Sequence, residues 1–166
     1  MTSAVRLRPG VSASDRAHAV RVAAGLVVPG ILLVALDRPG LIIYAVFGSF
    51  TGMYGRTDSR VVRLLHQSQG ALLLLTGTAV GIALAHAQAG APTVIVAAAA
   101  YSILGSMIAD FFALRPEGPF YGIFALGALA GVPPTLLDPV AAWLIAAAAA
   151  AIAIGIGLTG GDANPV

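Results

Sequence analysis

The chain has 166 residues, of which 58% are hydrophobic and only 10% are charged, and its mean hydropathy is +0.93. An ordinary soluble domain carries about 25% charged residues, so this composition excludes a water-soluble globular protein and favours a membrane protein. A net charge of only +2 argues against a nucleic-acid-binding surface. The absence of cysteine excludes disulfide bonds and thiolate chemistry.

Six apolar stretches alternate with short polar segments along the chain. A bilayer core of about 30 Å needs about 20 residues of helix, and the second and fifth stretches are shorter than this and rich in glycine. We therefore predict an all-α fold with six transmembrane helices. They are placed at about residues 19–36, 40–55, 69–87, 92–112, 119–135 and 139–158, with edges uncertain by a few residues.

Short polar segments between these stretches mark where the helices begin and end. Asp58 or Ser59 could cap the third helix, and Asp138 with Pro139 opens the sixth. The first apolar run follows a long polar segment without a cleavage site, so we interpret it as a retained helix. The expected domains are a cytoplasmic lead-in at 1–18, a transmembrane domain at 19–158 and a cytoplasmic tail at 159–166.

The arginines indicate how the chain is oriented. All nine basic residues are Arg, and eight of them fall on one side of the predicted bundle, with only Arg38 on the other. Because cytoplasmic loops are enriched in basic residues, both termini are expected in the cytoplasm. The eight are Arg6, Arg8, Arg16, Arg21, Arg56, Arg60, Arg63 and Arg115.

Two segments repeat at a constant offset of 77 residues. Residues 38–47 (RPGLIIYAVF) and 115–124 (RPEGPFYGIF) share Arg, Pro, Tyr and Phe at equivalent positions. Each opens a short helix, and the arginine count places the two openings on opposite sides of the membrane. This pattern is typical of two three-helix halves with inverted topology, although chance similarity in a chain of low complexity is the alternative.

Aromatic residues concentrate in the second and fifth predicted helices, which hold seven of the chain's eleven. Such faces could stack a flat ligand, with tyrosine hydroxyls as hydrogen-bonding groups. Ordinary packing and interfacial anchoring are the alternative. The candidate substrate-binding residues are Tyr44, Phe47, Tyr121 and Phe124.

Asp110 is the one acid inside a long apolar run, and it is the candidate for proton coupling. It also lies near the end of the fourth helix, where it could reach the interface or pair with Arg115. The histidines are not spaced as a metal site, and no catalytic triad, carboxylate pair or phosphate-binding loop is present. We therefore expect no metal, no cofactor and no enzymatic activity.

Three segments resemble the N-terminal membrane half of the fusaric acid resistance (FUSC) proteins. They are residues 45–55 (AVFGSFTGMYG) with the basic loop that follows, residues 76–81 (TGTAVG), and residues 115–126 (RPEGPFYGIFAL). The likeness covers roughly residues 15–158. Family members usually continue into a cytoplasmic domain and often a second membrane half. A chain of six helices is therefore expected to be either a half-size permease that assembles as a homo-oligomer or a truncated part of a longer protein.

The resemblance implies a multi-pass protein of the bacterial inner membrane, surrounded by lipid, that exports aromatic carboxylic acids or similar organic anions. Arg56 and Arg60 at the cytoplasmic mouth could attract such anions. The alternative hypothesis is a small membrane subunit or scaffold of a larger complex that transports nothing itself. The short chain and the scarcity of polar residues within the helices favour this alternative.

Overall fold

The computed structural model describes residues 13–55, 58–114 and 118–159, and over these residues the chain is helical, without strands. This confirms the predicted all-α class. The elements are α1 (Ala13–Ala35), the 3-10 segment η1 (Pro39–Leu41), α2 (Ile42–Ser49), the 3-10 segment η2 (Phe50–Met53), α3 (Arg60–His86), α4 (Ala91–Phe111), α5 (Phe120–Ala130) and α6 (Pro139–Leu158).

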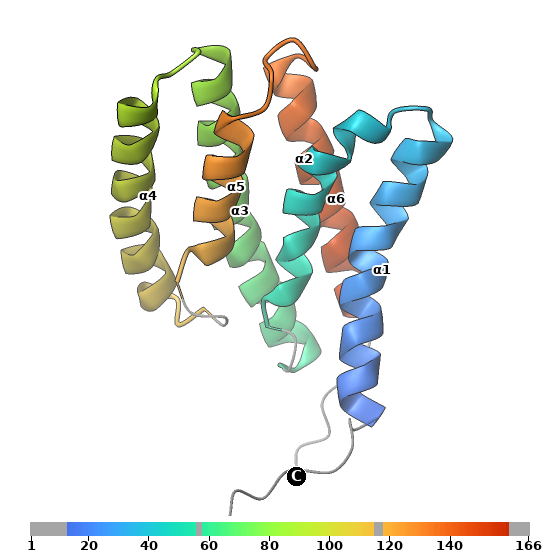
Figure 1. Ribbon diagram of the computed structural model, residues 1–166. Coiled ribbons are helices and arrows are strands. Elements are labelled where there is room, and N and C mark those ends of the chain that lie inside the picture. The colour runs from blue at the N-terminus through green and yellow to red at the C-terminus, as the bar shows by residue number, and fades with distance from the viewer. Residues whose placement is uncertain (1–12, 56–57, 115–117, 160–166) are drawn as a thin grey trace, which may run out of the picture.

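Successive helices run in opposite directions, so that α1 begins and α6 ends at the same end of the bundle (Figure 1). We call this the arginine end, because Arg21 and Arg63 lie there. The two long helices α3 and α6 pack against each other, α5 packs mainly on α3, and α2 packs mainly on α6. Helices α1 and α4 lie at the two outer edges of the bundle (Figure 1).

Small residues allow the central helices to approach closely. A Cβ atom at Gly48 of α2 would overlap the carbonyl oxygen of Ala146 in α6, and one at Gly77 of α3 would overlap the carbonyl oxygen of Gly122 in α5. Such contacts replace the hydrophobic driving force that is missing between helices in lipid. The buried face of α6 consists of small residues: Ala142, Ala146, Ala149, Ala150, Ala153 and Gly157.

Among the described helices, three are long and apolar enough to cross a membrane, namely α3, α4 and α6. This supports the prediction of a membrane protein. The apolar part of α1 is shorter, the second helix is divided into η1, α2 and η2, and α5 has 11 residues. At 1.5 Å per residue α5 is only about 16 Å long, roughly half of a bilayer core.

Three predicted boundaries need correction. The first helix was expected to begin near residue 19, but α1 begins at Ala13. The third helix was expected to begin near residue 69, but α3 begins at Arg60, because Arg63 and Gln67 in its first turns are buried against the rest of the bundle. The fifth was expected to reach residue 135, but α5 ends at Ala130, before Pro133 and Pro134. Proline removes a backbone donor and disfavours helix in the residue before it.

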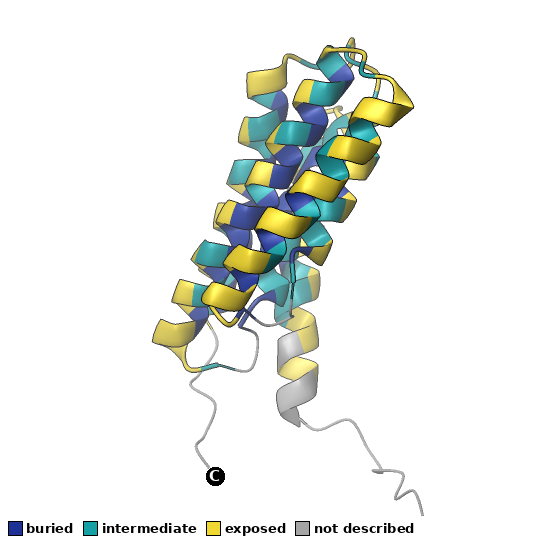
Figure 2. Cartoon of the chain, turned by 90° about the vertical axis from the view of Figure 1, so that its left-hand side faces the viewer, coloured by how far each residue is buried: buried dark blue, intermediate teal, exposed yellow. Residues whose placement is uncertain are grey.

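The outer surface of the bundle is apolar. Exposed residues run along the whole length of the bundle and are not confined to its ends (Figure 2). On α4 they include Ile95, Val96, Ile103, Leu104 and Met107, each more than half exposed. A soluble monomer rarely exposes a continuous surface of this kind, whereas lipid covers it without cost.

Candidate functional site

The two short helices α2 and α5 meet through aromatic rings. The ring centroids of Phe47 and Phe124 lie 5.6 Å apart in an edge-to-face arrangement. Those of Phe50 and Tyr121 lie 5.2 Å apart, and those of Tyr54 and Tyr121 lie 5.9 Å apart. These distances fall in the range of favourable aromatic pairs. We call these five residues the aromatic cluster.

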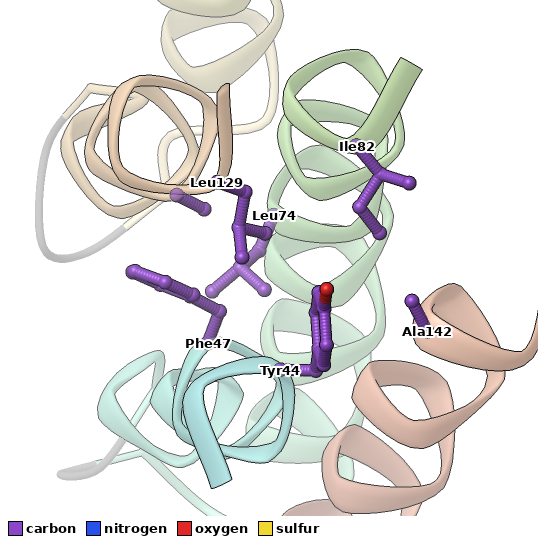
Figure 3. Close-up of a cluster of buried hydrophobic side chains, with 7 residues drawn as sticks. Tyr44, Phe47, Leu74, Ile82, Leu129 and Ala142 are labelled. Atoms are coloured by element: carbon purple, nitrogen blue, oxygen red, sulfur yellow. The ribbon is translucent and has the colours of Figure 1, made fainter. Parts of the chain in front are cut away.

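The four predicted substrate-binding residues occupy different depths. Tyr44 and Phe47 are each only 3% exposed and share a core with Leu74 and Leu129 (Figure 3). Tyr121 is half-buried, whereas Phe124 is 54% exposed on the outer side of α5. The structure thus brings Phe47, Tyr121 and Phe124 to the junction of α2 and α5, with Tyr44 one turn away in the core. The rings pack against one another, so a flat ligand would have to separate them.

Asp110 stands apart from the aromatic cluster. It lies in the last turn of α4, an outer helix, and its side chain is exposed. Residue 115, the alternative partner considered for its carboxylate, lies outside the described residues. Proton coupling through Asp110 therefore remains a prediction, and any coupling to the cluster would have to act over a distance.

Sequence reasoning missed two side chains that brace α3. The Tyr101 hydroxyl of α4 donates to the Leu73 carbonyl at 2.5 Å, and the Trp143 indole of α6 donates to the Leu75 carbonyl at 3.1 Å. An aromatic ring with a polar tip, placed within an apolar helix, commonly finds such a partner. That property was the available signal, but it does not specify which helix supplies the acceptor.

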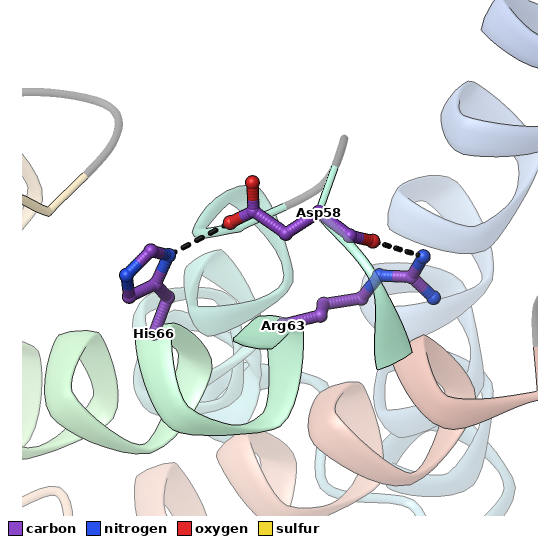
Figure 4. Close-up of polar contacts among 3 residues, drawn as sticks. All are labelled: Asp58, Arg63 and His66. Atoms are coloured by element: carbon purple, nitrogen blue, oxygen red, sulfur yellow. Dashed lines mark hydrogen bonds and ion pairs between the residues drawn. The ribbon is translucent and has the colours of Figure 1, made fainter. Parts of the chain in front are cut away.

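The second feature missed is a buried polar cluster at the arginine end. Arg63 and Gln67 are each 1% exposed, although both belong to a stretch that the sequence places near a membrane edge. Arg63 donates to the Gly157 carbonyl near the end of α6 at 2.7 Å. It also donates to the Asp58 carbonyl at 2.7 Å (Figure 4). The side chain therefore ties together α3, α6 and the turn that precedes α3.

The Asp58 carboxylate makes a further contact between this turn and α3. Its Oδ2 lies 2.7 Å from His66 Nδ1, and both side chains are partly exposed (Figure 4). Ser59 occupies the N-cap position of α3 without a side-chain hydrogen bond, so neither Asp58 nor Ser59 caps this helix as expected. The Asp58 carboxylate is used by the histidine two turns into the helix instead.

The arginines expected at the mouth have different surroundings. Arg60 is exposed, and residue 56 lies outside the described residues. Arg63 was assigned to the same loop, but it lies in the first turn of α3 and is buried. The helical spacing of Arg63, Gln67, Gly70 and Leu74, all buried, was the signal that could have placed it.

A small cavity adjoins this cluster. Its volume is about 10 Å³, and it is lined by Arg21, Val22, Gly52, Arg63, Gln67, Ala153 and Gly157. Gln67 Oε1 is buried and has no hydrogen-bond partner among the described residues. A cavity of this size holds about one water molecule or an atom of similar size. No group of three or more His, Cys, Asp or Glu side chains that could hold a metal ion occurs within the described ranges.

Over the described residues the fold and site are a helical bundle with three helices long and apolar enough to cross a membrane, an aromatic junction between its two short helices and a buried polar cluster at one end. No protein-family model, curated protein or solved structure matches the chain.

Proposed function

We propose that the chain is a membrane permease, or half of one, that moves aromatic carboxylic acids or similar organic anions out of the bacterial cytoplasm. This is the function that the resemblance to the FUSC proteins implies. The observation that carries it is the junction of two short, oppositely directed helices through the Phe47–Phe124 and Phe50–Tyr121 ring contacts. Short helices interrupted by Gly or Pro, at equivalent positions in two halves, point to the binding sites of transporters.

The arrangement of helices supports the inverted repeat that this proposal includes. Under the offset of 77, α2 corresponds to α5 and α3 to α6. The packing of α2 on α6 then corresponds to that of α5 on α3, and α1 and α4 occupy equivalent outer positions. We propose six spans with both termini in the cytoplasm. Because α2 and α5 are too short to cross the membrane alone, the second and fifth spans include the segments that flank these helices. Such segments are tolerated where protein covers them.

The decisive test is flux in proteoliposomes that hold the purified protein alone. Labelled benzoate should be released faster than from empty liposomes, and a pH gradient should increase the rate. Changing Tyr44 and Tyr121 together to Ala should abolish the flux. The matched control is Phe111→Leu, which alters an aromatic side chain that is 83% exposed on α4. Flux that survives the double change would overturn the site assignment.

Proton coupling is tested separately. Asp110→Asn keeps the shape of the side chain but removes its charge, so the mutant should carry benzoate at a rate that no longer depends on the pH gradient. If the gradient still drives the mutant, Asp110 is an interfacial residue only, and the permease hypothesis stands without it.

The alternative is a non-transporting subunit of a larger membrane complex, and one observation favours it. The rings of the aromatic cluster are in contact with one another and leave no separation for a ligand in this conformation. Absence of flux from folded protein, together with a stoichiometric partner after mild detergent extraction, would establish this alternative. Purification as a homo-oligomer with flux would support the permease half.

A further inference from the structure

Tyr54 carries a buried hydroxyl group that no described residue engages. The residue directly follows η2, and its side chain is 0% exposed. Its Oη atom has no hydrogen-bond partner in the part of the chain that the structure describes. Buried polar atoms normally have a partner from protein, water or ligand, because an unsatisfied one costs free energy. Tyr54 is not among the four residues that the sequence predicted to bind substrate.

The ring of Tyr54 is fixed by two helices. A Cβ atom at Gly70 of α3 would overlap ring carbons of Tyr54, so the ring lies directly against the backbone of α3. The same ring makes an edge-to-face contact with Tyr121 of α5, at a centroid distance of 5.9 Å. A ring held in this way keeps its hydroxyl in one place, and a precisely placed polar group gives a binding site its specificity.

The packing around Tyr54 does not account for its hydroxyl. Tyr54 shares a buried cluster with Leu73, Tyr101 and Leu126. The Tyr101 hydroxyl donates to the Leu73 carbonyl, whereas the Tyr54 hydroxyl has no partner among the described residues. A phenylalanine would fill the same space without a buried polar atom. The tyrosine at position 54 therefore points to a ligand that accepts a hydrogen bond from it.

The rings beside Tyr54 indicate where a flat ligand would enter. Phe50 and Tyr121 are half-buried, and their ring planes are inclined by 37°. The other ring pairs of the aromatic cluster are inclined by 71–77°. Rings that face each other more nearly can separate and accept a third ring in an offset stack. Because Tyr54 is fully buried and contacts the same Tyr121 ring, it lies at the inner end of such a stack.

The start of α5 favours negative charge at this inner end. Tyr121 lies in the first turn of α5, and Pro119 at the N-cap makes no side-chain hydrogen bond. The first amides of a helix have no partner within the helix, and the helix dipole gives this end a partial positive charge. A carboxylate bound to the Tyr54 hydroxyl would lie beside the first turn of α5 and would be stabilised there.

We propose that Tyr54 recognises the substrate at the aromatic junction. Its hydroxyl donates to a carboxylate oxygen of an aromatic acid, while the ring of the acid lies between Phe50 and Tyr121. This inference rests on the proposed function, because it names the group that selects a carboxylate for export. The ligand class is a flat ring with a carboxylate attached directly to it. A carboxylate without a ring has no place in the stack.

The test measures ligand binding, so that it can fail independently of transport. The thermal unfolding midpoint of the purified protein in a non-ionic detergent is followed with increasing sodium benzoate at neutral pH, where the acid is ionised. The reference is sodium acetate at the same concentration and ionic strength. Binding to the folded state alone raises the midpoint with the logarithm of ligand concentration above the dissociation constant. We expect this rise for benzoate and none for acetate.

Two matched variants each remove one hydroxyl group from the same buried cluster. Tyr54→Phe keeps the ring, and we expect it to raise the benzoate dissociation constant by about tenfold or more, because a hydrogen bond to a charged group is lost. Without benzoate its midpoint should equal or exceed that of the original chain. Tyr101→Phe loses the bond to the Leu73 carbonyl. It should lower the midpoint without benzoate and leave the benzoate dissociation constant unchanged.

The outcomes separate this inference from the proposed function. An unchanged benzoate dissociation constant in Tyr54→Phe would overturn the role of Tyr54, as would a midpoint without benzoate that falls as in Tyr101→Phe. No benzoate-specific rise in the original chain would also overturn it. Benzoate binding that depends on Tyr54, without benzoate flux in proteoliposomes, would retain the site and overturn the permease. Benzoate flux that is equal in the original chain and in Tyr54→Phe would retain the permease and overturn this inference.

Discussion

The α2–α6 and α3–α5 crossings have the same shape but different chemistry. In each, a short helix crosses a long one at a glycine that touches a backbone carbonyl: Gly48 at Ala146, and Gly77 at Gly122. The long helices differ. The buried face of α6 is made of alanine and glycine, whereas α3 adds buried Arg63 and Gln67 at one end. Similar packing therefore does not carry similar polar groups: the polar side chains come from α3, and the cavity beside them is lined by α1, η2, α3 and α6, with no described residue of α5.

The largest expected effect comes from Gly48→Ala. Its Cβ would overlap backbone atoms of α6, which cannot rotate away as a side chain can, so α2 must move outward. We expect a loss of about 3 kcal/mol, at the upper end for overpacking. Thermal unfolding in detergent measures it, with Gly155→Ala as the control that has open space around its Cβ. A midpoint equal to that of the control would show that the α2–α6 crossing does not depend on close approach.

Gly77→Ala applies the same change to the other crossing. The added Cβ would overlap the carbonyl oxygen of Gly122, but less deeply than a Cβ at Gly48 would overlap that of Ala146. We expect a smaller loss of about 2 kcal/mol, because a smaller displacement of the helices relieves the overlap. The same unfolding measurement applies, and Gly127→Ala on α5, which has nothing within 4 Å, is the matched control. A greater loss at Gly77 than at Gly48 would reverse this ranking of the two crossings.

Arg63→Met removes one of the two buried polar side chains by which the arginine end of α3 differs from α6. The Gly157 and Asp58 carbonyls would lose their donor, which costs about 1–3 kcal/mol where the groups are buried, while the methionine retains much of the volume. Arg60→Met, three residues earlier and exposed, should change stability by about 0.5 kcal/mol or less. Chemical unfolding of both variants in one detergent gives the comparison. Equal effects would mean that the buried hydrogen bonds of Arg63 add nothing to stability.

Asp138→Ala has the smallest expected effect and tests how the two long helices begin. The Asp138 carboxylate accepts from the Val140 and Ala141 amides at 3.0 and 3.1 Å, whereas Ser59 at the start of α3 makes no such bond. We expect a loss of about 1 kcal/mol for Asp138→Ala and little for Asp138→Asn, which still caps. Ser59→Ala should be close to neutral. A marked loss at Ser59 would show that its hydroxyl caps α3 in solution.

Hydrophobic patterning predicted the helical class and the approximate position of each helix, and it located the short second and fifth helices. It also assigned Asp138 to the start of the sixth helix, and the structure confirms this. These features depend on local chemistry: apolar runs, prolines, and residues that favour caps. The aromatic residues of the two short helices were identified for the same reason, since they are concentrated there in the sequence.

Only the tertiary structure decided which faces meet. Polarity placed Arg63 and Gln67 outside the membrane helix, but both are buried, because the carbonyls of the α6 terminus and of the turn at Asp58 provide partners for the guanidinium group. Whether a polar side chain points inward depends on such partners, which can be distant in the sequence. Gly157 lies 94 residues from Arg63. The sequence by itself therefore determined that this chain forms apolar helices. Long-range packing determined that Phe47 meets Phe124 and that two arginines share one cavity, because both depend on glycine-mediated crossings whose partner helices no local pattern specifies.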